Sequence, residues 1–190
     1  MPDFHTILAD TSALLGLASC DSECADLVFS EVKMTTSWTC FKEIRDKAKN
    51  GRSRALRQTA QRVIEYVQDN EIAYPTRVNI SSAPNAGSFD AGEKSLRIAL
   101  HKHDKFSTVV LFDKDAVVLL ENTRQQLADS GRDISIKPPN FPLFLLTRRD
   151  SDKPGIDNQT FCNQSEAMLQ RRDWKGSQQE PLFWNYPIDC

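Results

Sequence analysis

The sequence predicts an α/β fold in which a central parallel sheet carries helices on both faces. Short apolar segments alternate along the chain with segments whose apolar residues recur at helical spacing, and this alternation is typical of parallel sheets. The chain has 190 residues, of which 39% are hydrophobic and 26% charged. A chain of this size and composition can bury a core without disulfides or structural metals, so we expect an ordinary globular protein.

In the first part of the chain, the apolar residues 5–9 predict a strand that ends in Asp10. A helix follows at 13–18, for which Thr11 or Ser12 is the expected cap. Ser37 is the expected cap of a helix whose buried face includes Trp38. The remaining elements predicted in this part are helices at 21–29, 37–48 and 53–69 and a strand at 32–36.

The second part of the chain continues the alternation of strands and helices. An apolar segment that begins at Ser107 predicts a buried strand that ends before Asp113. The other predicted elements are a strand at 71–74, a loop at 76–88, helices at 90–100, 115–127, 141–146 and 159–174, a strand at 134–136 and a linker at 150–158. We divide the chain into a domain at 1–149 and a C-terminal part at 150–190, a linker, a helix and a loosely ordered tail that packs on or extends from the domain.

Composition narrows the class of protein. No segment approaches the 18 apolar residues of a membrane span, and no basic N-terminal segment precedes an apolar run, so we expect neither a membrane protein nor a signal peptide. The five cysteines are odd in number and form no Cys-x-x-Cys pair, which favours free thiols and a cytoplasmic protein. Three histidines without cysteines at ligand spacing do not indicate a zinc site.

Carboxylates stand where strands end or helices begin, at Asp10, Glu43, Glu93, Asp113 and Asp115. Ligands of an open parallel sheet bind outside the carboxyl ends of its strands, so these side chains are expected to converge on one edge. A pair of carboxylates at 4 Å costs about 4 kcal/mol at an effective dielectric of 20. Mg²⁺ or Mn²⁺ relieves such repulsion because hard cations take oxygen ligands. The set therefore predicts a divalent-metal site.

Each carboxylate also has a purely structural alternative. Asp10 can serve only as a helix start, and Glu43 can be a solvated residue paired with Lys47 one turn later. Asp90 and Glu93 fit a capping box, Asp-x-x-Glu, which we prefer for Asp90. Asp115 can cap the helix that follows it. Asp113 is the hardest to explain structurally, because it follows an almost wholly apolar strand.

Charge is unevenly distributed although the formal net charge is only −2. Residues 42–62, the basic arm, carry eight basic side chains against two acidic ones, and the rest of the chain has a balance of −8. A solvated helical hairpin is the simplest explanation. The alternative is a surface that guides phosphates toward Glu43, for which the candidate nucleic-acid-binding residues are Arg45, Lys49, Arg52 and Arg54.

Four short motifs together resemble the PIN-domain nuclease family, with the resemblance extending over roughly residues 4–146. They are Asp10-Thr11-Ser12 after a short strand, Phe41-Lys42-Glu43-Ile44, Asp90-Ala91-Gly92-Glu93 and Phe112-Asp113-Lys114-Asp115. The resemblance extends to microbial and archaeal members and to VapC-like toxins. It implies a three-layer α/β/α fold with a central parallel sheet, here followed by a C-terminal helical extension.

The same resemblance implies the function. It predicts an endoribonuclease that cleaves single-stranded RNA with water activated by Mg²⁺ or Mn²⁺. Asp10, Glu43, Glu93 and Asp113 would be the catalytic metal ligands, Asp115 a fifth, and the hydroxyl of Thr11 or Ser12 a further member of the metal shell. RNA is the expected partner, with an antitoxin or other protein and a homodimer as further candidates, because many relatives are toxins of toxin–antitoxin pairs and others process ribosomal RNA.

Two features depart from the family pattern, and two rival functions stay open. The third family position is often an aspartate deeper in a helix, whereas Glu93 follows Gly92, and the chain is longer than typical toxins. A non-catalytic PIN-like scaffold that binds RNA or protein is the first rival. The second is a phosphatase similar to the haloacid dehalogenase family, whose Asp-x-Asp motif resembles residues 113–115 but follows the first strand.

Overall fold

The fold is known from a computed structural model that describes residues 6–69, 91–112, 114–170 and 188. Its sheet has four parallel strands in the order β2-β1-β3-β4. The elements are β1 (Ile7–Ala9), α1 (Thr11–Ala18), α2 (Ser22–Glu31), β2 (Met34–Thr35), α3 (Trp38–Asn50), α4 (Arg54–Asp69), α5 (Ala91–Lys102), β3 (Thr108–Val110), α6 (Lys114–Asp129), β4 (Ser135–Lys137), α7 (Phe141–Thr147) and α8 (Asn158–Gln170).

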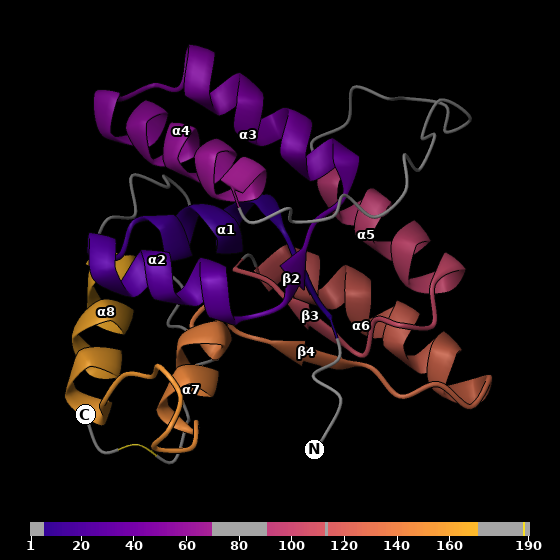
Figure 1. The fold of residues 1–190 in the computed structure, drawn as a ribbon. Helices are drawn as coiled ribbons and strands as arrows, with labels where there is room; N and C mark the ends of the chain where they lie inside the picture. Colours follow the sequence, from indigo (N-terminus) through magenta and orange to yellow (C-terminus); the bar gives the residue numbers. More distant parts are fainter. Residues whose placement is uncertain (1–5, 70–90, 113, 171–187, 189–190) are drawn as a thin grey trace.

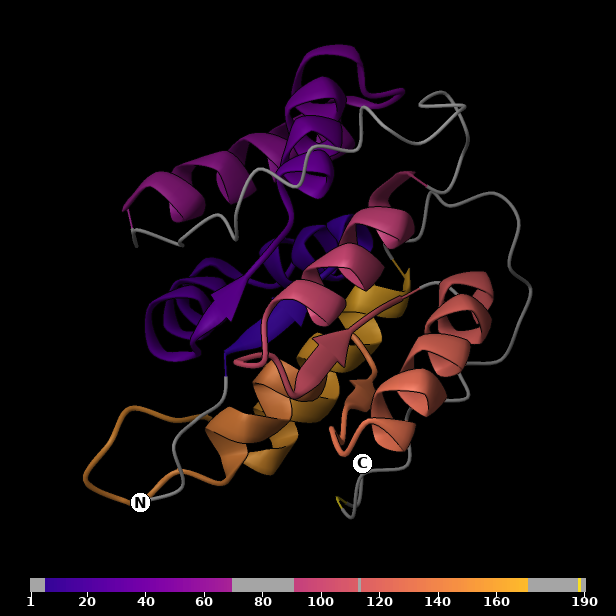
Figure 2. The same cartoon turned by 90° about the vertical axis from the view of Figure 1, so that its right-hand side faces the viewer.

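Alternate residues of the central strands supply the two faces of the sheet, because successive side chains of a strand point to opposite sides. Ile7, Ala9 and Val110 belong to the core cluster shared with α1, α2, α7 and α8. Leu8 and Val109 belong to the cluster shared with α5 and α6. Helices thus cover both faces, as Figures 1 and 2 show. The predicted three-layer α/β/α arrangement around a parallel sheet is confirmed.

Helices α3 and α4 form a hairpin at one end of the sheet (Figure 1). The Ser37 side chain caps α3 by accepting a hydrogen bond from the Cys40 amide at 3.1 Å, as the sequence predicts. Ile44 of α3 and Val63 of α4 are fully buried, and α1 packs against both helices. The hairpin therefore shares the main core while its outer surface faces solvent.

The C-terminal helix α8 is part of this same core. Its Phe161 and Met168 are 3% and 2% exposed and belong to the cluster that contains β1. Gly16 of α1 leaves room for this contact, since a Cβ atom there would lie 2.9 Å from the Met168 methyl group. Asn140 donates a buried hydrogen bond to Ser165 at 3.0 Å. Helix α8 therefore packs against the core cluster that contains β1 and α1.

The expectation of free thiols is wrong for one cysteine. Cys20, Cys24 and Cys40 are buried free thiols, whereas Cys162 is disulfide-bonded. A disulfide requires two Cα atoms about 4.4–6.8 Å apart, and the fold rather than spacing along the chain determines that separation. The strand expected at 71–74, the loop at 76–88 and helical residues 171–174 lie outside the described residues. No helix in the described ranges combines the length and apolarity needed to cross a bilayer.

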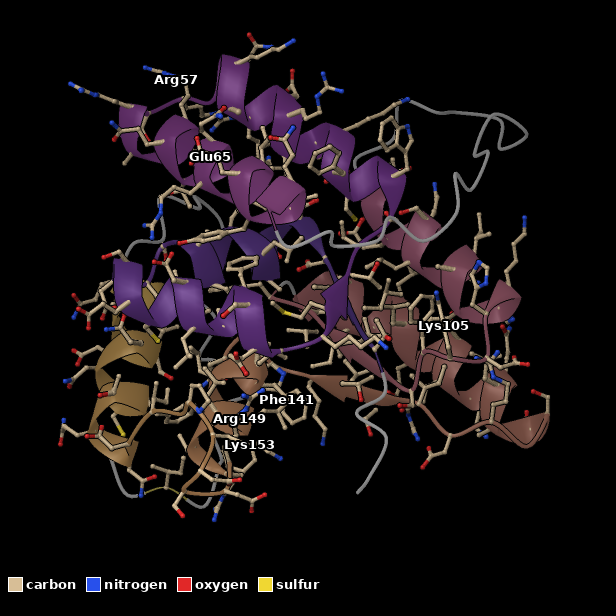
Figure 3. The ribbon with its side chains drawn as sticks, in the orientation of Figure 1. Arg57, Glu65, Lys105, Phe141, Arg149 and Lys153 are labelled. Carbon is tan, nitrogen blue, oxygen red and sulfur yellow. The ribbon has the colours of Figure 1, made fainter. Side chains whose placement is uncertain are left out.

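We expect Arg149 to stabilise the contact between α2 and the segment after α7. Its guanidinium, labelled in Figure 3, donates to both the side chain and the backbone carbonyl of Glu31, the last residue of α2. Arg149→Ala removes these half-buried, charge-assisted bonds. The free energy of unfolding should fall by about 1–3 kcal/mol, measured by urea denaturation.

Lys153→Ala is the matched control, because Lys153 pairs with Asp150 and both side chains are exposed. An exposed pair contributes about 0–1 kcal/mol. Equal effects of the two substitutions would contradict the role assigned to Arg149.

Candidate metal centre

The first candidate ligand, Asp10, lies where β1 ends and α1 begins. Its carboxylate accepts hydrogen bonds from the Ala13 amide at 2.6 Å and from the Ser12 hydroxyl. Asp10 is thus the N-cap of α1, and the prediction that Thr11 or Ser12 caps this helix is wrong because Thr11 is already its first helical residue. The Asp10 amide donates to the Val110 carbonyl at 3.1 Å, which extends the pairing of β1 with β3. Only 6% of Asp10 is exposed.

The second candidate, Glu43, lies in the second turn of α3 and is half-buried. The Thr11 hydroxyl donates to its Oε2 at 2.6 Å and lies 3.3 Å from the Cys40 carbonyl. The alternative pairing of Glu43 with Lys47 is not found among the ion pairs of the described residues. Thr11 therefore joins the start of α1 to the carboxylate of α3, close to Asp10.

Three carboxyl groups act on one another at this edge of the sheet. The pKa of Asp10 is raised from 3.8 to about 7, chiefly by burial, while hydrogen bonds from Ser12 and Ala13 act in the opposite direction. The negative charges of Glu93, in the first turn of α5, and then of Glu43 are smaller contributions to the same rise. No lysine or arginine pairs with Asp10 or Glu43 in the part of the chain that the structure describes. Asp10 is therefore a buried acid that forms no ion pair with any described residue.

The last two candidate ligands are Asp113 and Asp115. The structure describes neither Asp113 nor the side chain of Asp115, which lies in the first turn of α6. Asp90 of the expected capping box also lies outside the described residues. Within the described ranges, no group of three or more His, Cys, Asp or Glu side chains is arranged to hold a metal ion.

Helices α3 and α5 are in contact beside Glu43, and the sequence analysis did not predict this contact. A Cβ atom on Gly92 would lie 3.1 Å from Oε1 of Glu43 and 3.5 Å from Sγ of Cys40. Burial and then the charge of Glu43 raise the pKa of the Cys40 thiol to about 11, so it remains protonated. Ser95 is fully buried one turn after Gly92. The sequence signal for the close approach of α5 to α3 is the run of small residues Gly92, Ser95 and Ala99 on α5.

The basic arm lies on the outer surface of the α3–α4 hairpin. Its four predicted nucleic-acid-binding residues are all exposed: Arg45, Lys49, Arg52 and Arg54. Arg57, labelled in Figure 3, instead donates to the Gly51 carbonyl at 2.7 Å. Arg54, Arg57 and Arg62 line an open groove of about 660 Å³ on α4. The arm thus presents exposed cations together with arginines that hydrogen bonds hold in place.

The parallel sheet with carboxylates at one edge agrees with the resemblance to PIN domains, and comparison with known families identifies the family. The model of the halobacterial PIN-domain family matches residues 3–190, so the chain belongs to that family. The match includes α8. PIN domains are generally nucleases and typically use divalent metals, so a nuclease-type function follows for the chain. Searches of curated proteins and of solved structures return no match.

The described side chains suit a hard divalent cation. Asp10 and Glu43 offer oxygen atoms, the donors that Mg²⁺ and Mn²⁺ prefer. The raised pKa of Asp10 reflects a charge that burial and two neighbouring carboxylates disfavour, and a cation would remove that penalty. The protonated Cys40 thiol does not add a soft ligand.

We expect Asp10 to make the metal-free protein less stable as pH rises. Its pKa is about 7 when folded, against an ordinary value of 3.8, so the folded state binds more protons between these values. The free energy of unfolding should then decline across pH 4–7, by a few kcal/mol at about 1.4 kcal/mol per pKa unit, and level off above pH 7. Chemical denaturation in EDTA of wild type and Asp10→Asn isolates this contribution.

Asp157→Asn provides a control of opposite sign. The Thr160 amide donates to Asp157 and lowers the pKa of this exposed carboxyl, so its contribution is lost as pH falls. A stability difference between wild type and Asp10→Asn that stays constant from pH 4 to pH 7 would contradict the account of Asp10.

Proposed function

We propose that this PIN-domain protein is a divalent-metal-dependent endoribonuclease that cleaves single-stranded RNA. The observation that carries the proposal is the buried Asp10 carboxyl, which lies beside two other carboxylates and has no cationic partner in the described part of the chain. A buried charge of this kind is costly unless a cation joins it. Mg²⁺ or Mn²⁺ would supply that charge.

In this proposal Asp10, Glu43, Glu93 and Asp113 hold the cation, and Asp115 adds a fifth carboxylate. When bound, the cation makes water more acidic and stabilises charge on the phosphodiester. The chain's own contribution is orientation. Ser12 and Ala13 fix the Asp10 carboxylate and Thr11 fixes that of Glu43, so the ligands are arranged before substrate arrives.

The basic arm supports RNA as the substrate class. Exposed Arg45 and Lys49 follow Glu43 on the same helix, and Arg52 and Arg54 continue the charge to the turn between α3 and α4. Cations on this surface would attract the phosphates of a single strand. The groove lined by Arg54, Arg57 and Arg62 extends that positive surface along α4. Together these residues give a positive surface on the helical hairpin whose helix α3 also carries Glu43.

Removal of one ligand charge should abolish RNA cleavage in the presence of Mn²⁺. Glu43→Gln and Asp113→Asn each keep the side-chain shape, so the rate should fall about 100-fold or more, because loss of residues behind metal ligands alone typically costs 10–100-fold. Thermal stability without metal should stay equal or rise for Asp113→Asn, since carboxylate repulsion is relieved. Cleavage of a labelled single-stranded RNA measures the rates.

Glu166→Gln is the control, because Glu166 lies exposed on α8 and interacts with Gln170 on the same helix. It should cleave like wild type. Cleavage by wild type that persists in EDTA would overturn the metal-dependent mechanism.

The basic arm should govern the salt dependence of RNA binding. If Arg45, Lys49, Arg52 and Arg54 contact phosphates, log affinity falls with log salt by roughly 0.7 per contact on single strands. Replacing all four with Gln should flatten this slope by up to about 3 units and leave metal affinity nearly unchanged. Binding is measured across a salt series with Ca²⁺ in place of Mg²⁺ to suppress cleavage.

A solvated hairpin without contact to RNA predicts equal slopes for wild type and the fourfold variant. Equal slopes would show that the basic arm does not contact RNA and would contradict its proposed role.

A further inference from the structure

Two buried serines join the helices that carry Glu43 and Glu93. Ser37, at the N-cap of α3, is 1% exposed, and Ser95, in the second turn of α5, is fully buried. Their hydroxyl oxygens are hydrogen-bonded to each other across a sequence separation of 58 residues. This polar link ties α3 to α5 where the two helices pack together.

The donors in this network can be assigned because a hydroxyl has only one proton. Ser95 donates its proton to the Gly92 carbonyl at 2.6 Å, so Ser37 must donate to Ser95. The Ser37 oxygen accepts from the Cys40 amide at 3.1 Å. A directional chain of hydrogen bonds therefore runs from the first turn of α3, through both serines, to the first turn of α5.

Both ends of this chain lie against Glu43. Gly92 is so close that an added Cβ would be 3.1 Å from Oε1 and 3.4 Å from Oε2 of Glu43, and the same Cβ would be 3.5 Å from Sγ of Cys40. Glu93 is the next residue of α5. The serine link thus fixes the separation of the two helices at the level where each contributes a carboxylate.

We propose that Ser95 is a positioning residue, which acts through Ser37 and Gly92 to hold Glu43 and Glu93 at the separation needed to share a divalent cation. The inference rests on the proposed function, because it concerns the same carboxylates. Ser95 itself does not contact the cation in this scheme. Its loss would allow α3 and α5 to shift and would weaken cation binding more than a buried hydrogen bond elsewhere could.

Ser165 provides the matched control. It is also a buried serine in a helix, 4% exposed, and accepts one hydrogen bond from Asn140 at 3.0 Å. Ser165→Ala and Ser95→Ala each remove a buried hydroxyl, so both should lower the melting temperature by about 2–4 °C. A purely structural Ser95 would, like Ser165, leave Mn²⁺ binding unchanged when replaced by Ala.

The experiment is titration of the full chain with Mn²⁺, followed by calorimetry, for wild type and both variants. We expect Ser95→Ala to weaken Mn²⁺ binding about tenfold or more, as is typical when residues behind metal ligands are removed. Ser165→Ala should bind within about twofold of wild type. Ser37→Ala, which breaks the same interhelical bond but leaves the bond from Ser95 to Gly92, should also weaken binding and is measured should Ser95→Ala fail to fold.

The outcomes separate the two proposals. Wild type that takes up no Mn²⁺ would overturn the proposed function, and the positioning role with it. Wild type that binds Mn²⁺, with Ser95→Ala and Ser37→Ala both indistinguishable from Ser165→Ala, would overturn the positioning role alone.

Discussion

The parallel pairing of β1 with β3 is the constraint on which the acidic edge depends. The register places Ala9 opposite Val110, and the Asp10 amide continues the ladder by donating to the Val110 carbonyl. Asp10 is thereby fixed at the carboxyl end of the two central strands, where α1 begins. Because the strands are in register, the chain leaves β3 beside Asp10, at the point where ligands of parallel sheets bind.

The position of Asp10 has one stabilising and one destabilising consequence for the fold. Asp10 caps α1, a favourable role, yet burial and the charges of Glu93 and Glu43 raise its pKa to about 7. A neutral cap such as serine would serve the helix equally well without that penalty. Capping of α1 alone therefore does not explain why a carboxyl group, whose ionised form burial disfavours, occupies position 10. Binding of a cation would explain it.

Much of this fold could be predicted from alternating apolar segments, including the order of strands and helices and the Ser37 cap. Contacts between elements that are far apart in the sequence could not be predicted from spacing along the chain. The bond from Ser37 to Ser95 and the approach of Gly92 to Glu43 depend on how α3 and α5 pack, and the disulfide of Cys162 likewise depends on the fold and not on spacing along the chain. The cap of α1 was misjudged because Asp10, Thr11 and Ser12 all suit an N-cap, and only backbone angles distinguish them.

The two faces of α3 explain how acid and base can coexist on one helix. Glu43 lies on the side that faces α1 and α5, where Thr11 donates to it, whereas Arg45 and Lys49 are exposed. A helix advances about 100° per residue, so Arg45 and Lys49 lie roughly 160° and 120° around α3 from Glu43. No ion pair among the described residues joins these cations to Glu43, so its negative charge remains available for a metal, while the field of the cations still extends to approaching phosphates.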